Sequence, residues 1–184
     1  GTLFFAALLV REWGGGWRAQ LITMLCLVGA PAHLRMASML DIPVFEVFLC
    51  TLTAYLVWRG LSRGEKWSWI LAGVAGGLAI LAKHSSLLWG AALALGILAT
   101  PHRRVLLVPW PWLGALTAFV VFLPNLWWQM QNGFVMLEFM STARQEVLAT
   151  QGRLLFLAGQ ILYFHPLAVP VWIFGAAYGF FGRG

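Results

Sequence analysis

Seven apolar stretches, separated by short clusters of charged residues, constrain the fold of this chain more than any other feature. They cover residues 1–10 (a partial stretch), 19–34, 42–58, 67–82, 85–100, 105–124 and 153–181. An α-helix rises 1.5 Å per residue, so about 20 apolar residues cross the roughly 30 Å hydrocarbon core of a bilayer. Because lipid offers no partner to backbone polar groups, such stretches predict helices. We expect an all-α, polytopic transmembrane helical bundle with about six to seven membrane segments.

The composition argues against an ordinary soluble domain. Hydrophobic residues make up 61% of the 184 residues and charged residues 10%, against about 45 to 50% and 25% in soluble proteins. Even a folded chain of about 150 residues exposes nearly a third of its extended surface, so lipid must cover the remainder here. The net charge is +6. Because the basic residues lie singly or in short clusters between apolar stretches, they favour membrane lipids over nucleic acid as partners.

The loops differ in their basic residues. If every stretch crosses the membrane once, one side carries eight of them: Arg11, Arg18, Arg59, Arg63, Lys66, Arg103, Arg104 and Arg183. The other side carries four: Arg35, Lys83, Arg144 and Arg153. Cytoplasmic loops of membrane proteins are the richer in Lys and Arg, so we predict that the first side is cytoplasmic.

Two adjacent stretches are unusually short and close together. Residues 67–82 and 85–100 number 16 each, about 24 Å of helix. Only Lys83 and His84 separate them, which predicts a tight hairpin whose tip barely reaches the outer interface. Small residues let membrane helices approach closely, so we expect the two arms to pack against each other through the glycines at 73, 76 and 77.

A long outer segment, residues 125–152, follows the sixth stretch. Apolar residues recur in it with helical spacing, at 136, 140, 143 and 147. This pattern predicts a helix lying in the outer interface. We interpret residues 1–184 as a single transmembrane domain fragment, truncated at both ends, with 125–152 as an outer loop.

Ionisable groups beside the hydrocarbon are costly, so each is a candidate for function. His33, Arg35 and Asp41 flank a predicted outer loop. Asp41 precedes Pro43 and can cap the next helix, or it can serve as an acid, a base or an acceptor for substrate hydroxyls. Glu46 lies five residues into that span, and we favour a structural pairing with His33 or Arg35, or neutralisation.

Four further residues have a structural and a functional interpretation. Lys83 and His84 can anchor the hairpin tip, or they can bind the phosphate of a lipid-linked substrate. Arg144 is a solvated charge on the outer helix or an anion ligand. His165, followed by Pro166, favours a helix kink over metal ligation.

Phosphate-loop, HExxH, CxxC and nucleophile-elbow motifs do not occur in the sequence, so soluble-type nucleotide, zinc or serine-hydrolase chemistry has no support.

Several landmarks occur in a suggestive order. They are LDIP (40–43), YLVWRGL (55–61), GVAGGLAILAKHSSLL (73–88), LPNLWWQMQNG (123–133) and GRLLFLAGQILYFHPLAVPVWIFG (152–175). Together they resemble the membrane glycosyltransferases of the GT-C class, in the branch of bacterial protein O-mannosyltransferase relatives and the lipid A aminoarabinose transferase.

The resemblance implies a GT-C-like fold in the bacterial inner membrane with a periplasmic active site, so that 125–152 is a periplasmic loop. A sugar would pass from a polyprenyl-phosphate donor to a lipid, glycan or protein acceptor. Asp41 looks like the second acidic position of the family, Lys83 like a basic residue after the glycine-rich arm, and Arg144 like a basic residue near the donor phosphate. The principal catalytic aspartate of the family is expected upstream of residue 1, so the fragment alone is expected to be inactive.

The sequence departs from the family pattern at His84 and Glu46. No cofactor is implied with certainty, and a divalent metal stays open. Two other functions also stay open: a portion of a transporter or channel, in which Glu46, His33 and His165 line a polar path, and a non-catalytic membrane scaffold.

Overall fold

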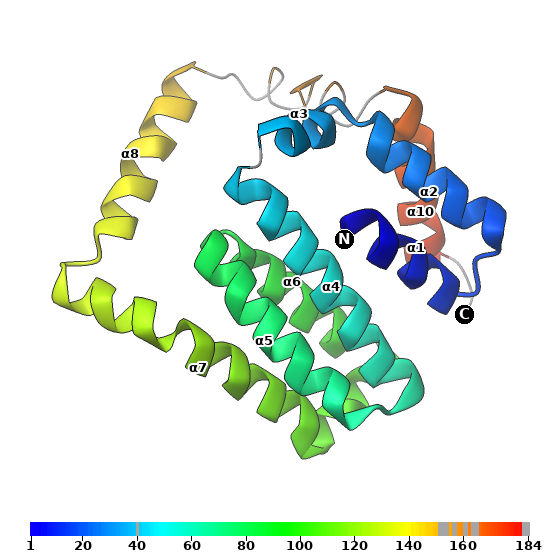
Figure 1. Cartoon of the computed structure of the whole chain (residues 1–184), viewed down its shortest axis with the longest axis horizontal. Coiled ribbons are helices and arrows are strands. Elements are labelled where there is room, and N and C mark those ends of the chain that lie inside the picture. Colours follow the sequence, from blue (N-terminus) through cyan, green and yellow to red (C-terminus); the bar gives the residue numbers. More distant parts are fainter. Residues whose placement is uncertain (40, 151–154, 156–157, 160–161, 163–165, 182–184) are drawn as a thin grey trace.

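The computed structural model describes residues 1–39, 41–150, 155, 158–159, 162 and 166–181, and every regular element in them is helical (Figure 1). The elements are α1 (Thr2–Glu12), α2 (Trp17–Gly29), α3 (Pro31–Met39), α4 (Ile42–Arg63), α5 (Lys66–Ala82), α6 (Ser86–Ala99), η1 (Pro101–Leu107), α7 (Pro109–Gln131), α8 (Val135–Thr150), η2 (Pro166–Ala168) and α10 (Val169–Phe181). The all-α prediction is confirmed for this part of the chain. His165 lies outside the described residues.

Two of these helices, α4 and α7, are long and apolar enough to cross a membrane, with 22 and 23 residues. The helices α2, α5 and α6 are also apolar but shorter. The predicted six to seven crossings therefore stay a prediction, and the described structure supports the coarser statement of an all-helical chain with two candidate spans.

The predicted stretch 19–34 does not form one helix. Helix α2 ends at Gly29, and α3 begins at Pro31 after Ala30 in an extended conformation. A residue that precedes proline is disfavoured in the helical conformation, which explains the break. His33 and Arg35 consequently lie on a short helix rather than beside a loop, which corrects the sequence-based placement.

Helix α4 has clear start and stop signals. The Asp41 carboxylate accepts a hydrogen bond from the Ile42 backbone N–H at 2.7 Å, and Pro43 occupies the first turn. Side-chain acceptors and proline both suit a helix start, because the first N–H groups have no partner within the helix. The helix ends before Gly64, whose φ of +65° is a left-handed conformation that glycine adopts at little cost. The capping role predicted for Asp41 is confirmed.

Helix α5 lies between α4 and α7 and packs closely against both (Figure 1). A Cβ atom on Gly73 would lie 2.1 Å from the Gly114 carbonyl oxygen of α7, and one on Gly77 would lie 2.7 Å from Val121 Cβ. The glycines therefore bring α5 against α7, as small residues do between membrane helices. The prediction that they join the two hairpin arms was wrong, because the tight contacts are made to α7 rather than α6.

An apolar cavity of about 360 Å³ lies between α4, α5, α6 and α7. Trp69, Leu93 and Ala118 contribute apolar walls, and the polar side chains of Thr53 and Ser86 also line it. Ser86 is the first residue of α6, so one part of the cavity lies next to the hairpin tip.

Helix α7 begins at Pro109 and continues past Pro124 to Gln131. The first residues of the predicted outer loop 125–152 are therefore helical. A corner with Gly133 and Phe134 in left-handed conformations leads to α8 (Figure 1). The predicted helix around Met136–Val147 is confirmed as α8, while its position in the membrane interface stays a prediction.

Candidate functional site

The antiparallel helices α4 and α5 create two polar clusters at opposite ends. The start of α4 lies beside the end of α5, and the end of α4 lies beside the start of α5. We call the first cluster the Lys83 end; its residues are Asp41, Glu46, Lys83, His84, Ser85, Ser86 and Asn125. We call the second the Arg59 end; its residues are Glu12, Tyr55, Arg59, Arg63, Glu65 and Ser68.

The carboxylate of Glu46 is the centre of the Lys83 end. Its Oε2 atom lies 3.4 Å from Lys83 Nζ. Its Oε1 atom accepts hydrogen bonds from the hydroxyls of Ser85 at 2.8 Å and Ser86 at 3.1 Å. The ammonium and both hydroxyls come from the hairpin tip, so one carboxylate of α4 holds the loop between α5 and α6.

His84 joins the same tip to α7. Its Nε2 atom lies 3.1 Å from Asn125 Oδ1, and its ring meets Phe122 edge to face with centroids 5.7 Å apart. Lys83 and His84 are consecutive but reach opposite neighbours, α4 and α7. The tip is therefore fixed from two sides.

The structure brings together only some of the residues predicted for the site. Lys83 and His84 share the hairpin tip. Asp41 precedes Glu46 by five residues on the same end of α4, although the ion pair of Lys83 is made to Glu46 and not to Asp41 within the described residues. The prediction that Glu46 pairs with His33 or Arg35 was wrong, because the end of α5 brings Lys83 to it.

The remaining predicted residues lie elsewhere. His33 lines a separate cavity of about 190 Å³ with Thr2 and Val44. Arg35 is exposed on α3. Arg144 belongs to α8, and its side chain lies outside the described part of the structure. The roles proposed for these residues stay predictions.

Sequence reasoning missed the polar partners that hold the hairpin tip. The sequence pattern places Asn125 only in the outer segment 125–152 and indicates no partner on another helix for Ser85 and Ser86. A weak signal existed in the adjacency of four polar residues, Lys83 to Ser86, between two apolar stretches. Such a run must satisfy its polar groups on neighbouring helices, since lipid cannot do so.

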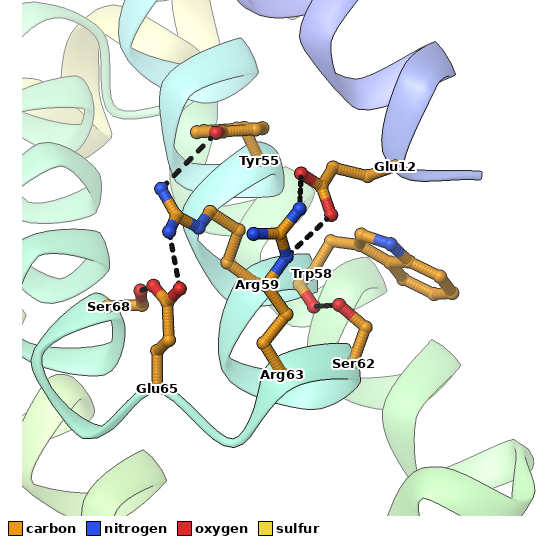
Figure 2. Close-up of polar contacts among 8 residues, drawn as sticks. All are labelled: Glu12, Tyr55, Trp58, Arg59, Ser62, Arg63, Glu65 and Ser68. Atoms are coloured by element: carbon orange, nitrogen blue, oxygen red, sulfur yellow. Dashed lines mark hydrogen bonds and ion pairs between the residues drawn. The ribbon is translucent and has the colours of Figure 1, made fainter. Parts of the chain in front are cut away.

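The Arg59 end is a network of paired charges (Figure 2). Arg63 donates to both carboxylate oxygens of Glu12, at 3.0 Å from Nε and 2.6 Å from Nη2, and so joins α4 to α1. Arg59 donates to Glu65 and, at 3.4 Å, to the Tyr55 hydroxyl. Glu65 also accepts from Ser68 at 2.9 Å.

The charge of Glu65 is stabilised in the folded chain. The hydrogen bond from Arg59, followed by that from Ser68, lowers the pKa of Glu65 below its usual value of 4.5. Both donors favour the ionised carboxylate. The acids and bases of the Arg59 end are therefore paired with one another.

The described residues include no group of three or more His, Cys, Asp or Glu side chains that could hold a metal ion.

A comparison with known families identifies the chain. Residues 2–128 match the family model described as dolichyl-phosphate-mannose-protein mannosyltransferase. The chain belongs to this family. It is a family of membrane glycosyltransferases that use dolichyl- or polyprenyl-phosphate-mannose as donor and proteins as acceptors.

The matched region of the mannosyltransferase family contains Asp41, Lys83, His84 and Asn125 and ends before α8. The resemblance noted from the sequence is confirmed over this region. No curated protein and no solved structure matched the chain.

Proposed function

We propose that this chain is part of a mannosyltransferase and binds the phosphate of a polyprenyl-phosphate-linked sugar at its Lys83 end. The observation that carries the proposal is the adjacency of a cation and an apolar cavity. The Lys83 side chain is 51% exposed, and Ser86 both belongs to the same tip and lines the 360 Å³ cavity. A polyprenyl phosphate has the matching chemistry, an anionic head on an apolar chain.

Lys83 would act on the leaving group. Transfer breaks the bond between the sugar C1 atom and the phosphate oxygen, while an acceptor oxygen forms the new bond to C1. Negative charge grows on the departing polyprenyl phosphate, and a nearby ammonium stabilises that charge more in the transition state than in the ground state. A lysine suits a mobile phosphate because its ammonium is a flexible point charge.

Asp41 would have an auxiliary role. Its Oδ1 atom accepts the Ile42 N–H, and the residue is exposed at the end of α4 that holds Glu46. An exposed carboxylate at this position can accept hydrogen bonds from sugar or acceptor hydroxyls. His33, Arg35 and Arg144 would also contact the substrate.

We assign the Lys83 end to the periplasmic face of a bacterial inner membrane. The support is the charge bias of the loops, because Arg63, Lys66, Arg103 and Arg104 belong to the opposite, more basic side. Arg63 belongs to the Arg59 end and Lys66 directly follows Glu65 of that end, in agreement with this sidedness.

A transport function fits the described residues less well. A polar path needs ionisable groups spread along several helices. The cavity between α4 and α7 is instead lined mostly by apolar side chains, with Thr53 and Ser86 as its hydroxyl groups. Such a lining suits an apolar chain.

The proposal is tested by Lys83→Met in the full-length protein. Methionine keeps an unbranched apolar side chain and removes the charge. We expect mannose transfer from polyprenyl-phosphate-mannose to fall about 100-fold, which corresponds to losing one strong electrostatic contact to the transition state. Lys83→Arg should retain part of the rate. Normal transfer by Lys83→Met, in protein present at the wild-type level in the membrane, would refute the proposed role.

A further inference from the structure

The Glu46 carboxylate is held in a way that does not depend on Lys83. Two hydroxyls, of Ser85 and Ser86, donate to Oε1 at 2.8 and 3.1 Å. The side chain of Glu46 is 16% exposed, so little water competes for it. Removing the ammonium from the other oxygen would leave the carboxylate bonded and in place.

The contact between Glu46 and Lys83 is looser than these bonds. Nζ lies 3.4 Å from Oε2, whereas a charge-assisted N–H···O bond is typically about 2.7 to 2.9 Å long. The Lys83 side chain is 51% exposed. The ammonium can therefore change partners while the carboxylate stays fixed to the serines.

We propose that Glu46 is a positioning residue that acts as the resting counter-ion of Lys83 and limits how tightly Lys83 holds a lipid monophosphate. The inference rests on the proposed function, because it assumes that Lys83 binds the donor phosphate. Its consequence is that Glu46 favours release of the polyprenyl phosphate product over retention.

The reason lies in the charges of the two lipid phosphates. A sugar-linked phosphate is a diester with a single negative charge, whereas the product is a monoester with a charge of about −1.5 to −2 near pH 7. Repulsion from a carboxylate grows with the charge of the ligand and is strong where water is scarce. Glu46 therefore opposes the product more than the donor.

The test uses Glu46→Gln in the full-length protein in detergent micelles. Glutamine keeps an Oε1 acceptor for the two serines but carries no charge. Binding of farnesyl phosphate and of mannosyl farnesyl phosphate is measured by isothermal titration calorimetry. We expect the monoester to bind about tenfold more tightly than to the wild type, and the diester only about threefold more tightly.

Two variants serve as controls. Glu65→Gln removes a carboxylate at the opposite Arg59 end, so both affinities should stay within about twofold of the wild type. Glu46→Asp withdraws the carboxylate from Lys83 by one methylene and should give an affinity for farnesyl phosphate between those of wild type and Glu46→Gln. The ranking of Glu, Asp and Gln tests the inference even where one variant folds poorly.

Steady-state kinetics provide a second readout. Tighter product binding by Glu46→Gln should lower both kcat and KM for the donor, whereas a purely structural defect would lower kcat without lowering KM. The double variant Lys83→Met, Glu46→Gln should gain less affinity over Lys83→Met than Glu46→Gln gains over the wild type, because only the direct repulsion is then relieved. Unchanged or weaker farnesyl phosphate binding by Glu46→Gln, or an equal gain for both ligands, would overturn the inference.

The two proposals fail in different ways. If Lys83→Met binds farnesyl phosphate as tightly as the wild type, the proposed function fails. If Lys83→Met weakens binding but Glu46→Gln does not strengthen it, the proposed function stands and only the counter-ion role of Glu46 is refuted.

Discussion

The Arg59 end and the Lys83 end both join distant segments through charged side chains, but they do so with different geometry. At the Arg59 end, two arginines face two glutamates, and Arg63 holds Glu12 through two hydrogen bonds of 2.6 and 3.0 Å. Arginine suits such pairs because its planar guanidinium matches both oxygens of a carboxylate. The acids and bases of this end are paired with each other.

The Lys83 end has one ammonium, and its ion pair is a single 3.4 Å contact. The carboxylate of that pair is bonded mainly by serines. A lysine in such a position can exchange its partner for a ligand. The comparison supports the proposal that the ammonium of Lys83 binds a ligand, whereas the charges of the Arg59 end hold helices together.

The largest effect expected at the Arg59 end is on stability rather than on activity. Arg63→Met removes both donors from Glu12, whose side chain is 12% exposed. An unsatisfied, mostly buried acceptor costs about 1 to 2 kcal/mol. We expect a lower midpoint of thermal unfolding in detergent, with mannose transfer within about twofold of wild type, the converse of Lys83→Met.

Arg103→Met, on the exposed surface of η1, is the matched control and should change neither quantity. Slower mannose transfer by Arg63→Met with an unchanged unfolding midpoint would contradict the assignment of stability to the Arg59 end and of activity to the Lys83 end.

A smaller effect is expected from the second attachment of the hairpin tip. His84→Phe keeps an aromatic ring against Phe122 but loses the 3.1 Å hydrogen bond to Asn125. One such bond contributes about 1 kcal/mol, so kcat/KM for the donor should fall about fivefold as Lys83 becomes less well positioned.

Asn125→Leu should reproduce this loss, and the two substitutions together should cost no more than either alone. Additive losses would show that His84 and Asn125 act separately.

The smallest effect concerns the pH dependence of stability at the Arg59 end. Because the pKa of Glu65 is lowered from 4.5 in the folded chain, its contribution is fully present above that value and is lost as the pH falls through the lowered pKa. We expect the unfolding midpoint to fall as the pH is reduced below about 4.5, measured between pH 3 and 7. The unfolding midpoint of Glu65→Gln should fall less over that interval. An identical fall of the midpoint in both proteins would contradict this account.

The start of α4 could be predicted from sequence because its signals are local. Asp41 supplies an acceptor to a free N–H group of the first turn, and Pro43 has no N–H group to satisfy. The structure has the expected cap. The short lengths of α5 and α6 followed in the same way from the charged residues between them. In contrast, the break at Ala30 was missed because the apolar stretch continues through it, although Pro31 was the available signal.

The partners of Glu46 and of the α5 glycines could not be predicted. A glutamate on an apolar helix must find a donor, but its sequence neighbours His33 and Arg35 were the wrong choice. The glycines at 73 and 77 required a close neighbour without indicating whether it would be α6 or α7.

By itself, the sequence determined that the chain is helical and apolar and that its basic residues are unequally distributed, since these properties follow from local composition and periodicity. The family resemblance was also carried by the sequence. Only the tertiary structure decided that α5 packs on α7 through its glycines, that Lys83 meets Glu46, and that a cavity reaches the hairpin tip at Ser86. The physical reason is that a helix dictates which residues share a face, while the choice of the helix that covers that face depends on packing and polar satisfaction across the whole bundle.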